Sequence, residues 1–183
     1  MMDRRPRTRR QDRPKKLLTE AELERRALAY AERFASTKTR FLAVLRRTIR
    51  RRGPSEHDAA LEAFALRLVE RYSSSGLVDD LRFAETRAAR LHRQGHPARA
   101  IAEKLRVAGV ERADITSAIG ESGASGVEGE RAAALSYAKR RRLGPFRVGD
   151  PKPFRQRDLM ALARRGFSRR VAESVLNGPA EDD

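Results

Sequence analysis

The stretch PARAIAEKLRVAGVERADITSAIG, residues 97–120, decides the fold. Pro97 suits the first turn of a helix, and Leu105 lies in a stripe of apolar residues at helical spacing. Gly109 can adopt the left-handed conformation that ends a helix. Two isoleucines four residues apart, Ile115 and Ile119, then give the next segment an apolar side of its own. The stretch therefore predicts two short amphipathic helices joined at a glycine turn.

The same pattern recurs 57 residues later in the chain. The shift places Leu105 on Leu162, Gly109 on Gly166, Val110 on Phe167 and Ile119 on Leu176. The first third of the chain fits this pattern more loosely. Self-similarity of this kind predicts three tandem three-helix units, each too small to be stable alone and therefore packed in a row.

The composition supports an all-α fold. The chain has 183 residues, with 28 Ala and 18 Leu but only 13 Val and Ile together and no Trp. Alanine, leucine, arginine and glutamate favour helices, whereas the residues that suit strands are scarce. Capping residues, glycines and prolines predict helices at about 20–35, 37–52, 55–73, 80–94, 97–108, 115–119, 130–142, 154–165 and 168–177.

These elements predict an elongated, curved array with short flanking segments. The expected divisions are a disordered basic arm (1–16), a first repeat (17–76), a second repeat (77–119), a flexible linker (120–129), a third repeat (130–178) and a tail (179–183). The arm holds eight basic and two acidic residues, so it cannot bury enough apolar surface to offset its ordering entropy.

The charge of the chain predicts a polyanionic partner. Lys and Arg total 41 against 25 Asp and Glu, which gives a formal net charge of +16. No cysteine is present, so disulfides, thiol catalysis and cysteine zinc sites are excluded, and a reducing cytoplasm is expected. The surplus of positive charge indicates nucleic acid or an acidic membrane surface as the partner. No apolar run is long enough to span a bilayer, and among these partners we expect nucleic acid and no membrane.

No set of residues predicts catalysis, a metal or a cofactor. His57, His92 and His96 lack the spacing of metal ligands, and we expect structural or solvent-exposed roles for them. The glycines of 123–129 do not form a phosphate-binding loop, which requires the pattern G-x-x-x-x-G-K-[ST]. An enzyme is therefore not predicted.

The basic residues carry the functional signal. They gather near helix ends, just before glycine or proline turns, and stacked units would align them as one basic face. The candidate binding residues are Arg46, Arg47, Arg50, Arg87, Arg90, Arg93, Arg99, Lys104, Arg106, Lys139, Arg140, Arg141, Arg142, Arg164 and Arg165. Favourable placement of cations at helix C-termini is the alternative explanation, although it does not account for the large surplus of charge.

One segment resembles a known family. The segment 76–84, GLVDDLRFA, looks like the G-[LI]-[LIV]-D-D-x-R-F-A signature of the RecX family, which regulates the RecA recombinase. The sequence RQGHPARAI-x-x-x-L-x-x-x-GV (93–110) follows at the expected distance, and 159–168 resembles the C-terminal repeat of the family. Within these segments we expect structural roles for Gly76, Asp79, Asp80, Phe83, Gly109 and Gly166. Phe83 should lie in the core, and Leu77 with Val78 should brace the start of the next helix.

The resemblance implies a cytoplasmic, non-enzymatic regulator built from three-helix repeats. Such a protein would bind the RecA filament on single-stranded DNA, as a monomer, and would restrain strand exchange, ATP hydrolysis and co-protease activity in DNA repair and the SOS response. A plain nucleic-acid-binding module that needs no RecA partner is the alternative. Stacking aromatic residues would favour that alternative, but the chain has only ten Phe and Tyr.

Overall fold

The computed structural model describes residues 17–51 and 55–179, so the predicted basic arm and nearly all of the predicted tail lie outside the described residues. Within this part, the regular elements are all helical, which confirms the all-α prediction. The α-helices are α1 (Glu20–Arg33), α2 (Lys38–Arg50), α3 (Asp58–Ser74), α4 (Asp80–Arg93), α5 (Ala98–Val107), α6 (Arg112–Glu121), α7 (Gly126–Arg141), α8 (Arg155–Arg165) and α9 (Arg169–Asn177). Two 3-10 turns, η1 (Gly144–Phe146) and η2 (Lys152–Phe154), lie between α7 and α8.

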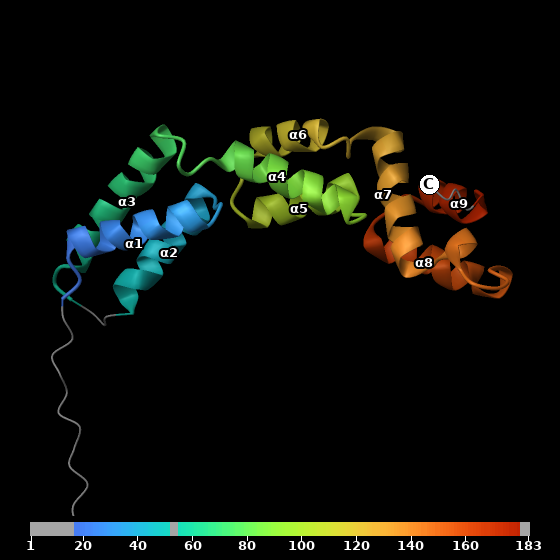
Figure 1. Cartoon of the computed structure of the whole chain (residues 1–183), viewed down its shortest axis with the longest axis horizontal. Coiled ribbons are helices and arrows are strands. Elements are labelled where there is room, and N and C mark those ends of the chain that lie inside the picture. Colours follow the sequence, from blue (N-terminus) through green and yellow to red (C-terminus); the bar gives the residue numbers. More distant parts are fainter. Residues whose placement is uncertain (1–16, 52–54, 180–183) are drawn as a thin grey trace, which may run out of the picture.

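The helices of the described residues form three groups of three, which lie along an elongated arc (Figure 1). Each group has its own apolar cluster. Phe41 is fully buried in the first group, Leu105 in the second and Leu162 in the third. No helix of the described residues is long and apolar enough to cross a membrane.

The glycine turn that recurs in the sequence also recurs in the structure. Gly109 has a φ of +85° and Gly166 a φ of +103°, both in the left-handed region. After each glycine, an apolar residue donates its backbone N–H to the leucine five residues earlier: Val110 to Leu105 and Phe167 to Leu162, both at 3.2 Å. The superposition by 57 residues is therefore confirmed at the level of backbone hydrogen bonds.

The first and second groups are joined by the N-terminus of α2. The Thr37 hydroxyl, fully buried, donates to the backbone carbonyl of Ala108 at 2.6 Å. The backbone N–H of Lys38 donates to the Asp80 carboxylate at 2.8 Å. A side chain at Gly109 would place its Cβ 2.5 Å from Thr39. A glycine is therefore needed at this position for the two groups to come this close.

The signature residues show how this joint is built. Asp79 caps α4, since its carboxylate accepts the backbone N–H of Arg82 at 2.9 Å. Asp80 instead accepts from α2, and its burial raises the pKa of its carboxyl group. Phe83 is only partly buried against the second cluster, with the Arg40 guanidinium 5.7 Å from its ring centroid. The sequence predicts Phe83 in the core, but it lies at the edge of the second cluster and is only partly buried.

Two expectations about local structure are wrong. Gly126–Gly129 belong to α7 rather than to a flexible linker, and α6 continues to Glu121. Gly129 is buried in α7, and the close packing there requires a glycine, since a Cβ would lie 2.3 Å from the carbonyl oxygen of Gly123. Val78 does not brace α4 but packs into the first cluster, because its N–H bonds back to Tyr72 O at 3.0 Å, while Leu77 is exposed.

Candidate nucleic-acid and partner interface

The second and third groups meet where the α4–α5 turn packs against α7. Gly95 in this turn has a φ of +66°, and a Cβ there would lie 2.7 Å from the backbone nitrogen of Tyr137. The Arg165 side chain, at the end of α8, donates through Nε to the carbonyl oxygen of Gly95 at 3.3 Å. A glycine is therefore required for the turn to come this close to α7.

Tyr137 brings two arginines together at this joint. The guanidinium of Arg165 lies 5.1 Å from the centroid of its ring and that of Arg140 lies 5.9 Å away. Each pair has the geometry of a cation–π contact. Burial lowers the pKa of Arg165, and the charge of Arg140 adds to this effect.

Four cations surround His96, which is half-buried in the same joint. We call Arg87, Lys104, Arg140 and Arg165 the joint cluster. Burial and then the charges of these four residues lower the pKa of His96 to about 4. The joint therefore carries a surplus of positive charge, which suits a bound anion.

The lowered pKa of half-buried His96 predicts that the free energy of unfolding depends on pH. The ordinary pKa of 6.5 applies in the unfolded chain, against about 4 in the folded chain. Between these values the unfolded chain binds a proton that the folded chain does not, so acidification across this window should lower the free energy of unfolding. Urea unfolding at about pH 7 and about pH 5 measures the effect, which His96→Gln should remove. The same replacement at exposed His57 should leave it in place, and an unchanged pH dependence in His96→Gln would contradict the prediction.

Arginines also line a polar hollow of about 460 Å³ between α7, η1 and α8. The polar hollow is lined by Tyr137, Arg141, Leu143, Arg147, Arg157, Asp158, Ala161, Arg164 and Arg165. Its described lining holds five arginines and a single acid.

The one acid in this lining is already engaged. Asp158 is 1% exposed, and it accepts the Gly144 backbone N–H at 2.8 Å and the Arg147 guanidinium at 2.6 Å. The Nε of Arg147 is buried without a hydrogen-bond partner among the described residues. Arg141, Arg157 and Arg164 are therefore available to an anion such as phosphate, whereas Arg165 already donates to Gly95.

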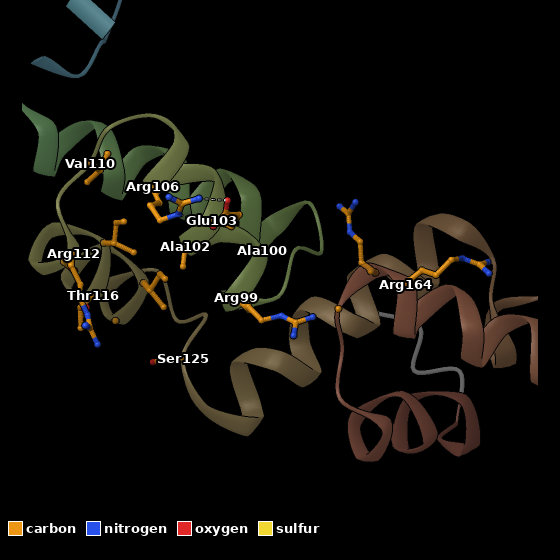
Figure 2. Close-up of a pocket in the computed structure, with 15 residues that line it drawn as sticks. Arg99, Ala100, Ala102, Glu103, Arg106, Val110, Arg112, Thr116, Ser125 and Arg164 are labelled. Carbon is orange, nitrogen blue, oxygen red and sulfur yellow. Dashed lines mark hydrogen bonds and ion pairs between the residues drawn. The ribbon is translucent and has the colours of Figure 1, made fainter. Parts of the chain in front are cut away.

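A second hollow, the apolar groove, lies between α5, α6 and the turn after α8 (Figure 2). Its volume is about 1040 Å³. The apolar groove is lined by Arg99, Ala100, Ala102, Glu103, Arg106, Val110, Arg112, Ile115, Thr116, Ile119, Gly120, Ser125, Arg164, Arg165 and Gly166. Arg164 and Arg165 line both hollows and so separate them.

The structure divides the basic residues predicted from the sequence into separate sets. The joint and the two hollows bring together Arg87, Arg99, Lys104, Arg106, Arg140, Arg141, Arg164 and Arg165. Exposed residues that line neither hollow are Arg90, Arg93, Lys139 and Arg142. The predicted residues of α2, namely Arg46, Arg47 and Arg50, lie in the first group, where Arg46 pairs with Glu62.

The sequence interpretation missed three basic or aromatic residues of these sites: Tyr137, Arg147 and Arg112. Tyr137 could have been found, because it precedes Arg140 by three positions on one helix and so shares its face. Arg147 gives no such signal, since its contact with Asp158 spans a loop. Among the described residues, no group of three or more His, Asp or Glu could hold a metal ion.

The fold and its two hollows define an all-helical protein of serially packed three-helix groups with arginine-lined surfaces. Residues 79–119 match the family model for the second three-helix domain of RecX. Regulatory protein RecX of Myxococcus xanthus (strain DK1622) is 37% identical over 160 residues, which cover 85% of this chain and 84% of that protein. The chain belongs to the RecX family of regulatory proteins.

Two further comparisons agree with this assignment. Regulatory protein RecX of Agrobacterium fabrum is 31% identical over 106 residues, which cover 57% of this chain and 54% of that protein. A crystal structure of regulatory protein RecX has a TM-score of 0.65 and 20% identity, over 87% of this chain and 72% of that chain. This last likeness concerns the fold alone.

Proposed function

We propose that the chain binds the RecA filament on single-stranded DNA and restrains the recombinase, as a cytoplasmic monomer without turnover of its own. The observation that carries the proposal is the polar hollow, in which five arginines and Tyr137 surround one engaged acid. Together with membership of the RecX family, this arrangement supports a nucleoprotein filament as the target. Inhibition of strand exchange, ATP hydrolysis and co-protease activity in DNA repair and the SOS response is part of the proposal.

The polar hollow and the joint cluster suit single-stranded DNA. A guanidinium group can form two parallel hydrogen bonds with the oxygens of one phosphate. The Tyr137 ring holds two such groups in place through cation–π contacts. Tyr137 borders both sites, since it lines the polar hollow and contacts Arg140 and Arg165. Further basic residues lie along the arc as far as α2, so several weak contacts can add up on one filament.

Turnover of ATP by RecA on single-stranded DNA tests the proposal. Saturating protein should lower that turnover and slow strand exchange, whereas the protein alone should hydrolyse no ATP. Unchanged RecA turnover and strand exchange at saturation would refute the regulator proposal. The plain nucleic-acid-binding module would then be favoured, since it binds DNA through the same arginines without affecting RecA.

The salt dependence of binding should show whether phosphate is contacted. Each contact releases counterions, so log K should fall with log salt by roughly 0.7 per contact on single strands. Neutralising Arg140, Arg141 and Arg142 together should lower this slope by about two if all three contact phosphate. The measurement compares wild type and the triple variant on naked and on RecA-coated DNA.

A matched triple neutralisation of Arg46, Arg47 and Arg50 tests the other end of the arc. If α2 makes fewer phosphate contacts than the third group, the slope of log K against log salt should change less in the α2 variant than in the α7 variant. An unchanged slope in the α7 variant, with a loss of helix stability of about 0.3–1 kcal/mol per charge, would instead favour the helix-dipole explanation.

A further inference from the structure

The two hollows on either side of Arg164 and Arg165 differ in chemistry. The polar hollow contains Tyr137 and mostly guanidinium groups. The apolar groove has a floor of aliphatic side chains, among them Val110, Ile115 and Ile119, and its described lining includes no aromatic ring. A surface with aliphatic side chains at its centre and charged groups at its edge is typical of a protein-binding site.

The charges around the apolar groove are mostly positive. Five arginines line it, and the one carboxylate in its described lining belongs to Glu103. Glu103 is engaged, because Arg106 donates to both of its oxygens at 2.9 and 2.8 Å. Figure 2 shows this pair, with Arg112 on the α6 side of the groove and Arg99 extending toward the third group. Within the described residues, Arg99, Arg112 and Arg164 form no ion pair with a carboxylate.

We propose that the apolar groove is the docking site for an acidic amphipathic segment of the protein component of the filament. The inference rests on the proposed function and names the chemistry by which the protein partner is recognised. Aliphatic side chains of the segment lie on the floor of the groove, and its carboxylates pair with Arg99 and Arg112, whereas the Arg164 side chain extends away from the groove (Figure 2). Such a segment is recognised in the way that amphipathic helices occupy apolar grooves, and the arginine rim selects acidic sequences over basic ones.

Nucleic acid is a poorer occupant of the apolar groove. Single-stranded bases bind mainly by stacking on aromatic rings, and the described groove lining offers none. Phosphate alone would leave the aliphatic floor uncovered. The shared arginines, Arg164 and Arg165, thus let one face of the chain contact DNA in the polar hollow and protein in the groove.

Two substitutions change the charge of the groove without disturbing the fold. Arg112 is exposed at the first position of α6, where a glutamate is favourable to the helix dipole, so Arg112→Glu should fold normally. Thr116→Glu adds an acid at an exposed position of the same helix, whose hydroxyl bonds only within α6. Arg25→Glu, at an exposed position of α1, is the control with the same change in net charge as Arg112→Glu.

The experiment measures binding of each variant to naked and to RecA-coated single-stranded DNA. Loss of a charge-assisted contact should weaken binding of Arg112→Glu to the coated filament by about tenfold to a hundredfold. Thr116→Glu should weaken it in the same direction, whereas Arg25→Glu should bind within about twofold of wild type. Binding of all three to naked DNA should also stay within about twofold of wild type.

A peptide competitor identifies the kind of occupant. The probe is a helical peptide with leucines at i, i+3, i+4 and i+7 and glutamates elsewhere; its counterpart carries lysines in place of the glutamates. The acidic peptide should displace wild type from the coated filament and not from naked DNA. The basic peptide competes for the DNA phosphates itself, so it is tested by fluorescence against free wild type, to which it should not bind. Failure of the acidic peptide to displace the protein overturns the inference.

The outcomes separate this inference from the proposed function. If Arg112→Glu loses equal affinity for naked and for coated DNA, the groove binds nucleic acid. If Arg112→Glu binds the coated filament as tightly as wild type does, the groove is not the docking site. Either result overturns this inference and leaves the proposed function standing. If wild type does not recognise the coated filament at all, the proposed function fails. Fluorescence binding of the acidic peptide to wild type and to Arg112→Glu then still tests the groove, since only wild type should bind it.

Discussion

Replacing Asp158 with alanine should destabilise the third group by about 3–5 kcal/mol, the usual cost of breaking a buried ion pair from one side. Asp158 is 1% exposed, and it accepts from Arg147 and from the backbone of Gly144. Without the carboxylate, the Arg147 guanidinium, whose Nε already lacks a partner among the described residues, loses its counter-charge as well. Urea unfolding followed by circular dichroism measures the loss.

An exposed ion pair provides the control. Glu103 pairs with Arg106 at the surface, so Glu103→Ala should cost no more than about 1 kcal/mol. The loss of free energy of unfolding for Asp158→Asn should lie between the losses for Asp158→Ala and Glu103→Ala, because an amide oxygen can still accept from Gly144. A cost for Asp158→Ala as small as that for Glu103→Ala would show that the ion pair does not hold the η1 turn on α8.

The same variant links stability to the proposed binding. Asp158 supplies the one carboxylate in the described lining of the polar hollow, so its removal makes the hollow more positive. Folded Asp158→Ala, studied well below its unfolding temperature, should therefore bind naked single-stranded DNA more tightly than wild type, with a steeper salt dependence.

Replacing Leu105 or Leu162 with alanine should cost about 2–5 kcal/mol each. Both side chains are fully buried, and they occupy corresponding positions in the second and third groups. In a row of packed units, each unit contacts only its neighbours. Leu162→Ala should therefore unfold the end of the arc first, whereas Leu105→Ala should weaken the central group on which both neighbours pack.

Hydrogen exchange of the separate groups can distinguish these two patterns, and urea unfolding gives the free energies. Leu66, which is 48% exposed on α3, supplies the control, because Leu66→Ala should stay within about 0.5 kcal/mol of wild type. A cost below about 0.5 kcal/mol for either buried leucine would contradict the correspondence of the repeats.

The sequence alone determined the features that depend on local interactions. Helical spacing of apolar residues, together with capping residues, glycines and prolines, predicted most of the helices to within a few residues. Gly109 and Gly166 marked the helix ends because the left-handed turn favours glycine whatever the surroundings. The surplus of arginine likewise predicted a basic surface without any knowledge of its shape.

Only the tertiary structure decided which of these residues meet. Asp80 accepts from Lys38, 42 positions away, and Arg165 reaches the carbonyl of Gly95, 70 positions away. The glycines of 120–129 looked flexible in the sequence, yet Gly129 lies within α7 and is glycine because the backbone of Gly123 lies against it. Helix periodicity records which side of a helix is apolar, but not which turn of a distant helix it packs on. The joint cluster and the two hollows depend on that packing, so they could be recognised only once the helices were in place.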